Sequence, residues 1–467
     1  MSTRIEHDML GEIEVPFEAY YGAHSARALA NFPITGEKLA DRPHLVTALA
    51  AVKQAAAAAN SEIGALDAAS AEAITRACTE IRAGALREEF VVDLIQGGAG
   101  TSTNMNANEV IANRALELLG HARGDYGHLH PLDHVNLGQS TNDVYPTAVK
   151  LALDGYLGEL LGALAGLRAA FTAKAAEFAE VVKIGRTQLQ DAVPMTLGQE
   201  FGAYAATLAE DEQRLAEARP LLHELNLGGT AIGTGLNARP GYRERAIAQL
   251  RALTGIDTLS SAPDLIEATQ DVGVFVQLSG VLKRVAVKLS KICNDLRLLS
   301  SGPQAGLGEI ALPAMQAGSS IMPGKVNPVI PEAVNQIAFE VIGNDVTVTL
   351  AAEGGQLQLN AFEPIIARAL TAGIDHLTNG ITILTRHCVD GITANRDHLA
   401  GTVSASTGLV TALSPALGYE IASSVALEAQ HTGRPALELV RERGLLSSQQ
   451  LRALTSPQAL TGQAGAP

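Results

Sequence analysis

Residues 264–300 read DLIEATQDVGVFVQLSGVLKRVAVKLSKICNDLRLLS and contain no proline. Spacings of three and four alternate between their apolar residues Phe275, Leu278, Leu282, Val285, Leu289, Ile292, Leu296 and Leu299. This spacing places all eight side chains along one face of an α-helix. A helix over 264–300 would be about 55 Å long at 1.5 Å per residue. The stretch therefore predicts one long helix of a helix bundle.

Further apolar residues lie outside this seam, at Val272, Val274, Val276, Val281 and Val287. More than one flank of the helix should then be covered, which indicates that the bundle joins several chains. A second seam with the same periodicity runs through Leu153, Leu157, Leu160, Leu164, Leu167 and Phe171. We therefore expect several long helices packed side by side.

Prolines separate the predicted helices, because proline is tolerated only near a helix start. Proline-free windows span 44–130, 147–193, 264–302 and 332–363. Five prolines are gathered between Pro303 and Pro331, which predicts one long break in the middle of the chain. We place an N-terminal helical domain at 1–142, a central bundle at 143–394 and a small C-terminal helical domain at 395–467. The last residues, 461–467, are expected to form a polar tail.

Composition supports an all-α architecture. Hydrophobic residues make up 47% of the 467 residues, but aromatic residues only 4%, and tryptophan is absent. Burial must then come from many small and medium side chains, mainly alanine and leucine, which favour helices. A chain of this length is sufficient for roughly three domains.

The charge balance argues against a nucleic-acid partner. Lysine and arginine total 34 against 49 acidic residues, and no basic run is present that could follow a phosphate backbone. The three cysteines, Cys78, Cys293 and Cys388, have no metal-ligand spacing and are expected to be reduced thiols. The charged N-terminus and the lack of a long apolar run predict no signal peptide and no membrane span. We expect a cytoplasmic protein.

The segment Gly318-Ser-Ser-Ile-Met-Pro-Gly-Lys-Val-Asn-Pro328 is the strongest candidate for a functional site. Hydroxyls, a cation and an amide stand together inside a chain that is otherwise rich in alanine and leucine. The spacing argues against a phosphate-binding loop, because five residues separate Gly318 from Gly324 and Val326 occupies the position of the magnesium-binding hydroxyl. The alternative is a simple loop between two helices.

Three other polar segments interrupt the helical pattern. Residues 97–106 form a glycine loop followed by hydroxyls and amides, which suits either an anion site or an ordinary helix start. Residues 139–143 have capping-box spacing between Ser140 and Asp143, although a capped helix start can also bind a carboxylate. Residues 185–194, taken alone, indicate a turn between two helices. Together with Lys325 these segments supply many neutral donors, but no metal-ligand cluster and no Ser–His–Asp group.

The four segments resemble the fumarase/aspartase superfamily, and among its branches the aspartases. The resemblance extends over nearly the whole chain and includes residues 8–11, 20–22, 31–34, 96–113, 133–136, 233–237 and 291–302. It implies a homotetramer whose central bundle joins helices of all four subunits, with each active site built from three chains. It also implies reversible anti elimination of ammonia from L-aspartate to give fumarate, through an aci-carboxylate intermediate.

The resemblance further assigns roles to individual residues. The base is Ser319. The substrate's α-carboxylate is held by Lys325 and Asn327. The β-carboxylate is surrounded by Thr101, Ser140, Thr141 and Ser320. Near the amino group lie Asn142, Thr187 and Gln188.

Gln188 separates two branches of this family. Fumarases and some aspartases carry a histidine at this position, and in fumarases that histidine pairs with the residue matching Glu332 to handle water. Hydroxide is a poor leaving group and needs this proton management, whereas an ammonium group already carries its proton. Glutamine cannot shuttle a proton. The sequence therefore favours an ammonia-lyase over a fumarate hydratase.

A structural role is the alternative to an enzymatic one in this family. Some family members are non-catalytic structural proteins of the lens, but intact Ser319, Lys325 and Asn327 favour an enzyme. Residues 357–364 carry Ala–Phe where aspartases are expected to carry Val–Met, and residues 130–133 match the family's secondary-site segment only in part. We expect no required cofactor. Magnesium activates some relatives, and no carboxylate cluster in the sequence decides that question here.

Overall fold

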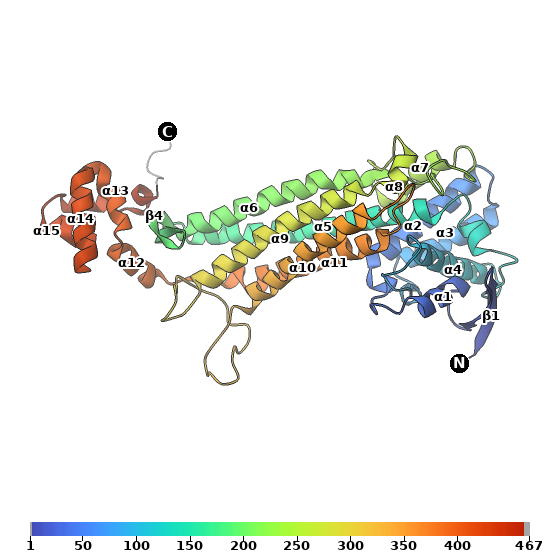
Figure 1. The fold of residues 1–467 in the computed structure, drawn as a ribbon, viewed down its shortest axis with the longest axis horizontal. Coiled ribbons are helices and arrows are strands. Elements are labelled where there is room, and N and C mark those ends of the chain that lie inside the picture. Colours follow the sequence, from blue (N-terminus) through green and yellow to red (C-terminus); the bar gives the residue numbers. More distant parts are fainter. Residues whose placement is uncertain (1, 462–467) are drawn as a thin grey trace. The chain divides into compact units, whose positions relative to one another are not determined.

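The computed structural model describes residues 2–461 and is predominantly helical, which confirms the predicted all-α class (Figure 1). The helices of its N-terminal third are α1 (Ala23–Asn31), α2 (Pro43–Glu62), α3 (Ala68–Arg82) and α4 (Thr101–Leu118). The long helices are α5 (Thr141–Glu177), α6 (Leu197–Ala218), α9 (Gly273–Leu299), α10 (Val329–Glu353) and α11 (Glu363–His387). Shorter helices are α7 (Tyr242–Thr254), α8 (Leu265–Gln270), α12 (Arg396–Ala405), α13 (Gly408–Leu417), α14 (Tyr419–Thr432), α15 (Ala436–Glu442), α16 (Ser448–Leu454) and α17 (Pro457–Leu460).

Four two-stranded sheets accompany the helices within residues 2–461. The antiparallel pairs are β1 (Thr3–Asp8) with β2 (Gly11–Pro16), β3 (Val182–Thr187) with β4 (Gln190–Thr196), and β7 (Ile310–Ala311) with β8 (Thr393–Ala394). The one parallel pair joins β5 (Glu224–Leu225) to β6 (Ser260–Ser261). None of these sheets is large enough to form a core of its own, so the helices provide it.

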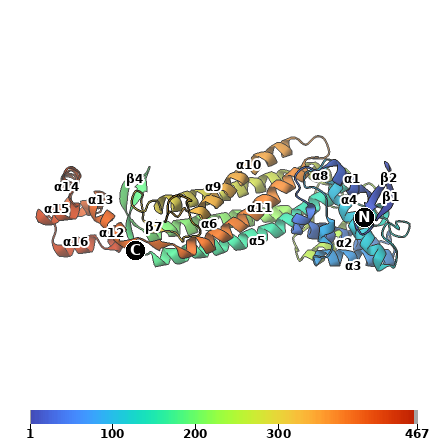
Figure 2. The same cartoon turned by 90° about the horizontal axis from the view of Figure 1, so that it is seen from below.

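The chain divides into two compact units. The first comprises residues 1–161, 213–284 and 339–376, and the second comprises 162–212, 285–338 and 377–467. Each unit contains parts of the long helices, which run next to one another within it (Figure 2). In the second unit Phe171 of α5 packs on Phe201 of α6, with ring centroids 5.8 Å apart. The three predicted domains, with boundaries after residues 142 and 394, stay a prediction.

Both predicted seams are buried. The eight apolar residues of the first seam, Phe275 to Leu299, are each at most 5% exposed, and the six of the second are fully buried. The prediction of one continuous helix over 264–300 was wrong, however, because the helix is interrupted between α8 and α9. Asp271 has an extended backbone at the break, and its carboxylate accepts a hydrogen bond of 2.9 Å from the N–H of Gly273. A local cap of this kind competes with helix continuation, and apolar spacing does not reveal it.

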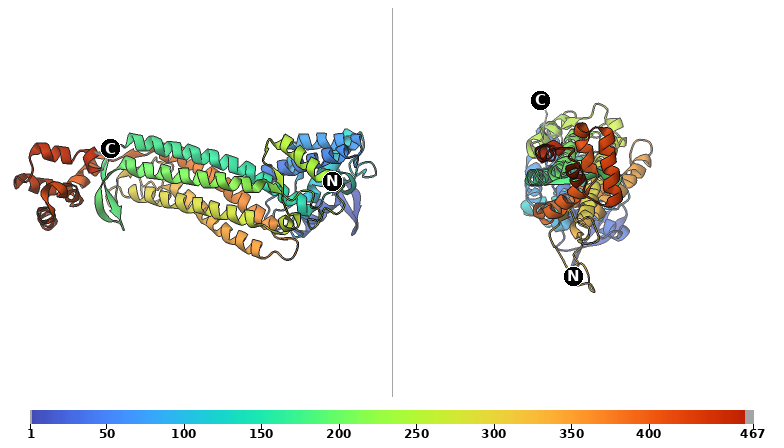
Figure 3. Two further views of the ribbon diagram at one scale, coloured as in Figure 1. Left: turned by 90° about the horizontal axis from the view of Figure 1, so that it is seen from above. Right: turned by 90° about the vertical axis from the view of Figure 1, so that its left-hand side faces the viewer.

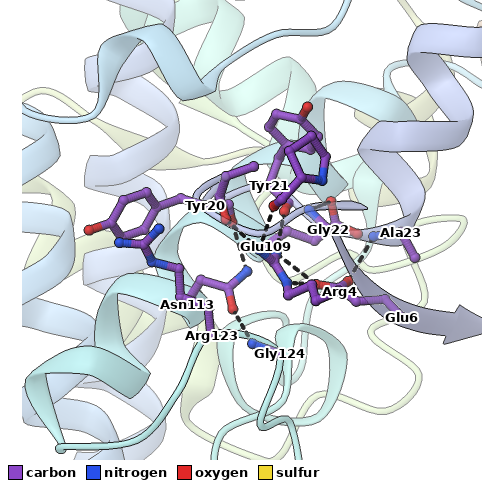
Figure 4. Close-up of polar contacts among 12 residues, drawn as sticks. Arg4, Glu6, Tyr20, Tyr21, Gly22, Ala23, Glu109, Asn113, Arg123 and Gly124 are labelled. Atoms are coloured by element: carbon purple, nitrogen blue, oxygen red, sulfur yellow. Dashed lines mark hydrogen bonds and ion pairs between the residues drawn. The ribbon is translucent and has the colours of Figure 1, made fainter. Parts of the chain in front are cut away.

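In the first unit, a buried carboxylate of α4 and one of the β1–β2 hairpin both bind the start of α1 (Figure 4). Glu109 of α4 accepts hydrogen bonds from the backbone N–H groups of Gly22, His24 and Ser25. Glu6 of β1 accepts one from the N–H of Ala23, at 2.9 Å. These bonds satisfy the free N–H groups at the start of α1, which has no side-chain cap of its own.

In the second unit, residues 185–194 form the β3–β4 hairpin and not the predicted turn between helices (Figure 2, Figure 3). Gln188 and Leu189 make its two-residue turn, both with positive φ, at 55° and 63°. Two such residues give the turn type whose twist matches a hairpin, although it is normally built from Asn–Gly. The atypical residues explain why the sequence did not indicate a hairpin.

The predicted break around the five prolines is present. Between the end of α9 and the start of α10, residues 300–328 contain no helix, and Figure 1 shows them as a long loop. The C-terminal helices α13 to α16 enclose a small core of their own that includes Leu413, Val425 and Leu439. All three cysteines are buried free thiols. No helix within 2–461 is long and apolar enough to span a membrane. The predicted tail, apart from Thr461, lies outside the described residues.

Candidate active site

The first unit contains a cavity of about 430 Å³ lined by polar residues from several segments. Among them are three of the predicted β-carboxylate residues, Thr101, Ser140 and Thr141. Others come from the loop after β5, including Thr230, Ala231 and Asn237. The structure thus brings together residues that are up to 213 positions apart, counted from His24 to Asn237.

Thr101 is the first residue of α4, where the backbone N–H groups of a helix point outward and attract anions. The residue before it, Gly100, has φ of 92° and presses against α5. A side chain at Gly100 would place its Cβ 2.5 Å from the ring of Tyr145, which is closer than carbon atoms approach. Only glycine fits there, so the glycine loop both starts α4 and fixes the position of Thr101.

Ser140 and Asp143 cap the start of α5, as the spacing predicted. The carboxylate of Asp143 accepts the N–H of Ser140 at 2.9 Å, and the Ser140 hydroxyl accepts the N–H of Asn142 at 3.2 Å. Burial raises the pKa of Asp143 to about 6, against hydrogen bonds from Ser140, Thr230 and Gly228 that lower it. Asn142 donates to the carbonyl of Ala231 at 2.8 Å. The cap therefore also anchors the loop that forms the opposite wall of the cavity.

Four amide and amine side chains support this cavity. Asn104 and Gln139 lie in the predicted polar segments and Asn136 in a segment of the family resemblance, whereas the sequence did not indicate Lys53. Lys53 of α2 is fully buried, and its Nζ donates to Asn136 Oδ1 at 2.8 Å and to Gln139 Oε1 at 3.0 Å. Asn104 donates to Asn136 Oδ1 and to Thr141 Oγ1, both at 3.2 Å. Burial lowers the pKa of Lys53 to about 7, although the charge of Asp143 opposes that shift. Lys53 is thus a buried amine behind the cavity wall whose charge burial disfavours.

Ser319 lies in the second unit, in the loop 318–328. Its hydroxyl oxygen accepts hydrogen bonds from two backbone N–H groups, those of Ile321 at 3.2 Å and Met322 at 3.0 Å. Donors aimed at this oxygen favour its negatively charged form. The residue types at 319–322 therefore fold into a turn that suits a serine acting as a base.

The loop is closed at its base. The N–H of Gly318 donates to the carbonyl of Lys325 at 2.8 Å, and Asn327 Nδ2 donates to the carbonyl of Gly318 at 2.9 Å. A Cβ at Gly318 would lie 2.8 Å from the Lys325 oxygen, so close approach is what requires glycine there. Gly324, with φ of 81°, is the position in the loop that needs backbone freedom.

Lys325 and Asn327 also line a second cavity, of about 530 Å³, together with Arg297 and Glu332. Ser320 and Lys325 are exposed, and the structure gives the Lys325 side chain no hydrogen bond or ion pair within 2–461. A cation with free donors in a loop beside a cavity is suited to binding a carboxylate.

Thr187 and Gln188 lie at the exposed tip of the β3–β4 hairpin, also in the second unit. The hairpin is held at its base by Lys183, whose Nζ contacts Glu309 at 2.5 Å and Glu200 at 2.8 Å. Arg186 makes a further ion pair with Glu309. Two cations on one buried carboxylate make the base of the hairpin rigid and leave its tip free to present polar groups.

The predicted site residues therefore fall into two sets. Thr101, Ser140, Thr141 and Asn142 lie in the first unit, and Thr187, Gln188, Ser319, Ser320, Lys325 and Asn327 in the second. Each set offers hydrogen-bond donors suited to carboxylates, and the second also offers a candidate base. The site residues contain only amide, hydroxyl and amine groups, so they do not include the histidine, cysteine and carboxylate ligands of a typical metal site.

Comparison with known proteins places this geometry in a family. The lyase family model matches residues 11–343, and the model of the fumarase C C-terminus matches residues 409–462. The chain is 59% identical to the aspartate ammonia-lyase of Pseudomonas aeruginosa over 98% of its own length and 96% of that protein. It is 52% identical to the aspartate ammonia-lyase of Escherichia coli K12, with the same shares covered.

Solved structures of the same family have the same fold as this chain. The fold matches a fumarate lyase:delta crystallin from Brucella melitensis bound to cobalt, with a TM-score of 0.95 and 55% identity over 98% of this chain and 99% of that one. It also matches the class II fumarase of Schistosoma mansoni, with a TM-score of 0.92 and 36% identity over 99% of this chain and all of that one. The resemblance seen in the sequence is thereby confirmed, and the chain belongs to the fumarase/aspartase superfamily of lyases.

Proposed function

We propose that this chain is an aspartate ammonia-lyase, which eliminates ammonia from L-aspartate to give fumarate. The observation that carries the proposal is its similarity to aspartate ammonia-lyases, 52–59% identical over nearly the full length. Within that family, the Ser319 oxygen accepting two backbone N–H bonds supports a serine base.

The reaction begins with proton abstraction. Ser319, as an alkoxide, takes a proton from C3 of aspartate, and the electron pair of that C–H bond moves onto the adjacent β-carboxylate. This aci-carboxylate carries two negative oxygens and requires donors that are already in position. Thr101, Ser140, Thr141 and Ser320 are the proposed donors, and the start of α4 adds its outward N–H groups.

The second step expels the amine. As the C2=C3 double bond forms, the electron pair of the C–N bond leaves with nitrogen, and ammonia departs without needing a further proton. Gln188 can hydrogen-bond the amino group but cannot transfer protons, and Asn142 and Thr187 complete that part of the site. Lys325 and Asn327 hold the α-carboxylate, which orients C2 for elimination.

We further propose that each complete site is shared by several chains. The two sets of site residues belong to different units of one chain, and the long helices present apolar side chains to solvent in the isolated subunit. On α10, Phe339, Val346 and Leu350 are 61%, 58% and 65% exposed and follow one helix face. Covering this face in a homotetramer, with each site shared by three subunits, accounts for both features. We also propose the three domains predicted from the sequence, at 1–142, 143–394 and 395–467.

Neither a cofactor nor a membrane enters this proposal. Proton abstraction and ammonia loss use only side-chain and backbone groups of the chain, so no cofactor is required, and magnesium would act as an activator and not as a reactant. The three buried free thiols are consistent with a reducing, cytoplasmic location.

Purified protein incubated with fumarate tests the proposal directly. We expect ultraviolet absorbance of fumarate to fall only when ammonia is present, with L-aspartate as the product. Malate formation without ammonia would instead identify a hydratase. Absence of either reaction would identify a structural member of the family.

Ser319→Ala tests the base. We expect kcat for aspartate to fall at least about a hundredfold, because removing a general base costs roughly that much. Ser448→Ala, an exposed serine at the start of α16, is the matched control and should retain full activity. Undiminished turnover in the Ser319 variant, measured on a correctly assembled protein, would exclude Ser319 as the base.

A further inference from the structure

The loop after α4 gathers three side chains that can bind a metal, although we expected no metal-ligand cluster from the sequence. His121, Asp125 and His128 each offer one ligand atom, and these atoms all lie within 4.8 Å of one another. They are four and then three residues apart in the sequence. In a helix this spacing would place them on one face, but these residues lie in a loop. The loop and not a helix face therefore brings them together.

The distances match the ligand separation of a tetrahedral ion. The Nδ1 atoms of His128 and His121 lie 3.2 Å and 3.7 Å from Asp125 Oδ2. Two ligands that are each bound at about 2.0–2.1 Å in a tetrahedral site are roughly 3.4 Å apart. The two imidazole rings are stacked, with centroids 3.8 Å apart and an angle of 23° between their planes. Because the nitrogen lone pairs of stacked rings lie in nearly parallel planes, the two imidazoles must rotate about their side-chain bonds before both nitrogens face one ion.

The backbone of this loop is held in place independently of any ion (Figure 4). Asn113, fully buried on α4, accepts the N–H of Gly124 at 2.8 Å and donates to the Tyr126 hydroxyl at 3.1 Å. The N–H of His128 donates to the carbonyl of Asp125 at 3.0 Å. Because the anchored residues lie between the two histidines, the backbone that carries the three ligands is positioned in advance, which reduces the entropy lost on binding.

Nearby cations are already engaged and would not repel an ion strongly. Arg123 pairs with Glu117 at 2.7 Å and lies over the ring of Tyr20, 3.9 Å from its centroid. Arg4 is bound to Glu6 at 2.7 Å and to four backbone carbonyls. The three candidate ligands are partly exposed, with side chains 33%, 42% and 56% accessible, so water can complete the coordination.

We propose that His121, Asp125 and His128 form a binding site for a divalent transition-metal ion of the Zn²⁺ or Co²⁺ type, separate from the proposed catalytic residues. Two imidazoles and one carboxylate suit these ions, whereas Mg²⁺ prefers oxygen ligands only. The bound ion would crosslink the loop 121–128 and stabilise the fold of the first unit by mass action. It takes no part in the elimination reaction.

The test uses the full-length, untagged protein after removal of metals with a chelator. Isothermal titration with Zn²⁺, and visible absorbance on addition of Co²⁺, should reveal one site per chain with micromolar affinity or better. His121→Ala and His128→Ala should each weaken Zn²⁺ binding at least tenfold, because two remaining ligands hold an ion poorly. Added Zn²⁺ should raise the melting temperature of the wild-type protein and leave that of both variants unchanged.

His431→Ala is the matched control, since His431 is an exposed histidine on α14 whose Nδ1 contacts only the Leu427 carbonyl within its own helix. It should bind Zn²⁺ like the wild type. Melting temperatures in the presence of chelator verify that the loop variants are folded, and Asp125→Asn provides a variant of nearly the same shape. Wild-type affinity in the histidine variants, or no site in the wild type, would overturn the proposal.

Discussion

At the scale of single residues, Lys53 shows how a buried amine can serve a cavity that it does not line. Its Nζ contacts Asn136 and Gln139, both of which line the cavity of the first unit. Asn136 Oδ1 also accepts bonds from Asn104 and Asn108. One amide oxygen thus receives three donors, and Lys53 fixes the orientation of two amides that line the cavity.

Lys53→Met should therefore raise the KM for L-aspartate about tenfold, because two buried amide oxygens lose their donor. The control is Gln54→Met, at the next position of α2, where the side chain bonds Thr79 and Arg82 away from the cavity. Both variants should lose stability, but only Lys53→Met should change KM. Equal KM values in steady-state assays of the two variants would contradict a positioning role.

Glu363 predicts a dependence of stability on pH. It is fully buried at the start of α11, and burial raises its pKa to about 8, partly opposed by the charge of Lys150. The folded protein then holds a proton that the unfolded chain releases above about pH 4.3. The stabilisation is complete below that pH and is lost as the pH rises through 8, at up to about 1.4 kcal/mol per pH unit.

In Glu363→Gln this loss of stability at high pH should disappear. The melting temperature of the variant minus that of the wild type should therefore increase from pH 5 to pH 9. Glu353→Gln removes an exposed carboxylate at the end of α10 and should show no such trend. Parallel melting curves of wild type and Glu363→Gln across this range would be inconsistent with a buried, protonated carboxyl.

The sequence identified the residues whose types are unusual for their surroundings. Ser319, Lys325 and Asn327 stand out in an alanine-rich chain, and the structure places them in one loop closed at its base. Lys53 could not be identified in this way. It lies in a helix where lysine is common, and its role depends on amides 83 and 86 positions further along the chain. Pairings over such distances require the fold.

At the scale of elements, the start of α4 depends on Gly100. Gly100→Ala would introduce a residue with positive φ and a Cβ 2.5 Å from the Tyr145 ring. We expect kcat/KM to fall more than tenfold, because the clash must displace Thr101, in addition to a stability loss of about 1–3 kcal/mol. Kinetic assays and denaturant unfolding measure the two effects.

Gly120→Ala separates the effect of the Tyr145 clash from the effect of positive-φ backbone strain. Gly120 also has positive φ, at 85°, but a Cβ there would meet nothing within 4 Å. This variant should show the backbone strain of about 1 kcal/mol and keep its activity. Equal activity in both alanine variants would mean that the contact with Tyr145 does not position Thr101.

Helices with long apolar seams were predictable, and their interruptions were not. The seam of α9 is continuous with the apolar residues of α8, yet the Asp271 side chain ends one helix and starts the next. The β3–β4 hairpin was missed for the opposite reason, because Gln188 and Leu189 adopt positive φ without the asparagine or glycine that normally indicates it. In both cases a single local conformation outweighed the periodicity on which the prediction relied.

At the scale of the whole molecule, the exposed face of α10 predicts association. Val346→Glu places a charge in the centre of the apolar face formed with Phe339 and Leu350, and burying that charge would cost several kcal/mol. We expect the wild type to sediment as a tetramer and the variant to dissociate and lose activity. Leu427→Glu, at a position 56% exposed on α14, should remain tetrameric and active. A Val346 variant with wild-type sedimentation would exclude this face from the interface.

The closed base of the loop 318–328 affects how the protein should respond to a protease. The backbone and side-chain bonds of Gly318, Lys325 and Asn327 join the two stems, so the ends produced by a cut near Met322 would stay attached to the body. The severed tip would nevertheless lose the turn that directs two N–H groups to Ser319. A nicked enzyme would then keep its fold and its assembly but lose turnover. The time until the first cut in this loop, and not the time until unfolding, would therefore limit how long the enzyme stays active.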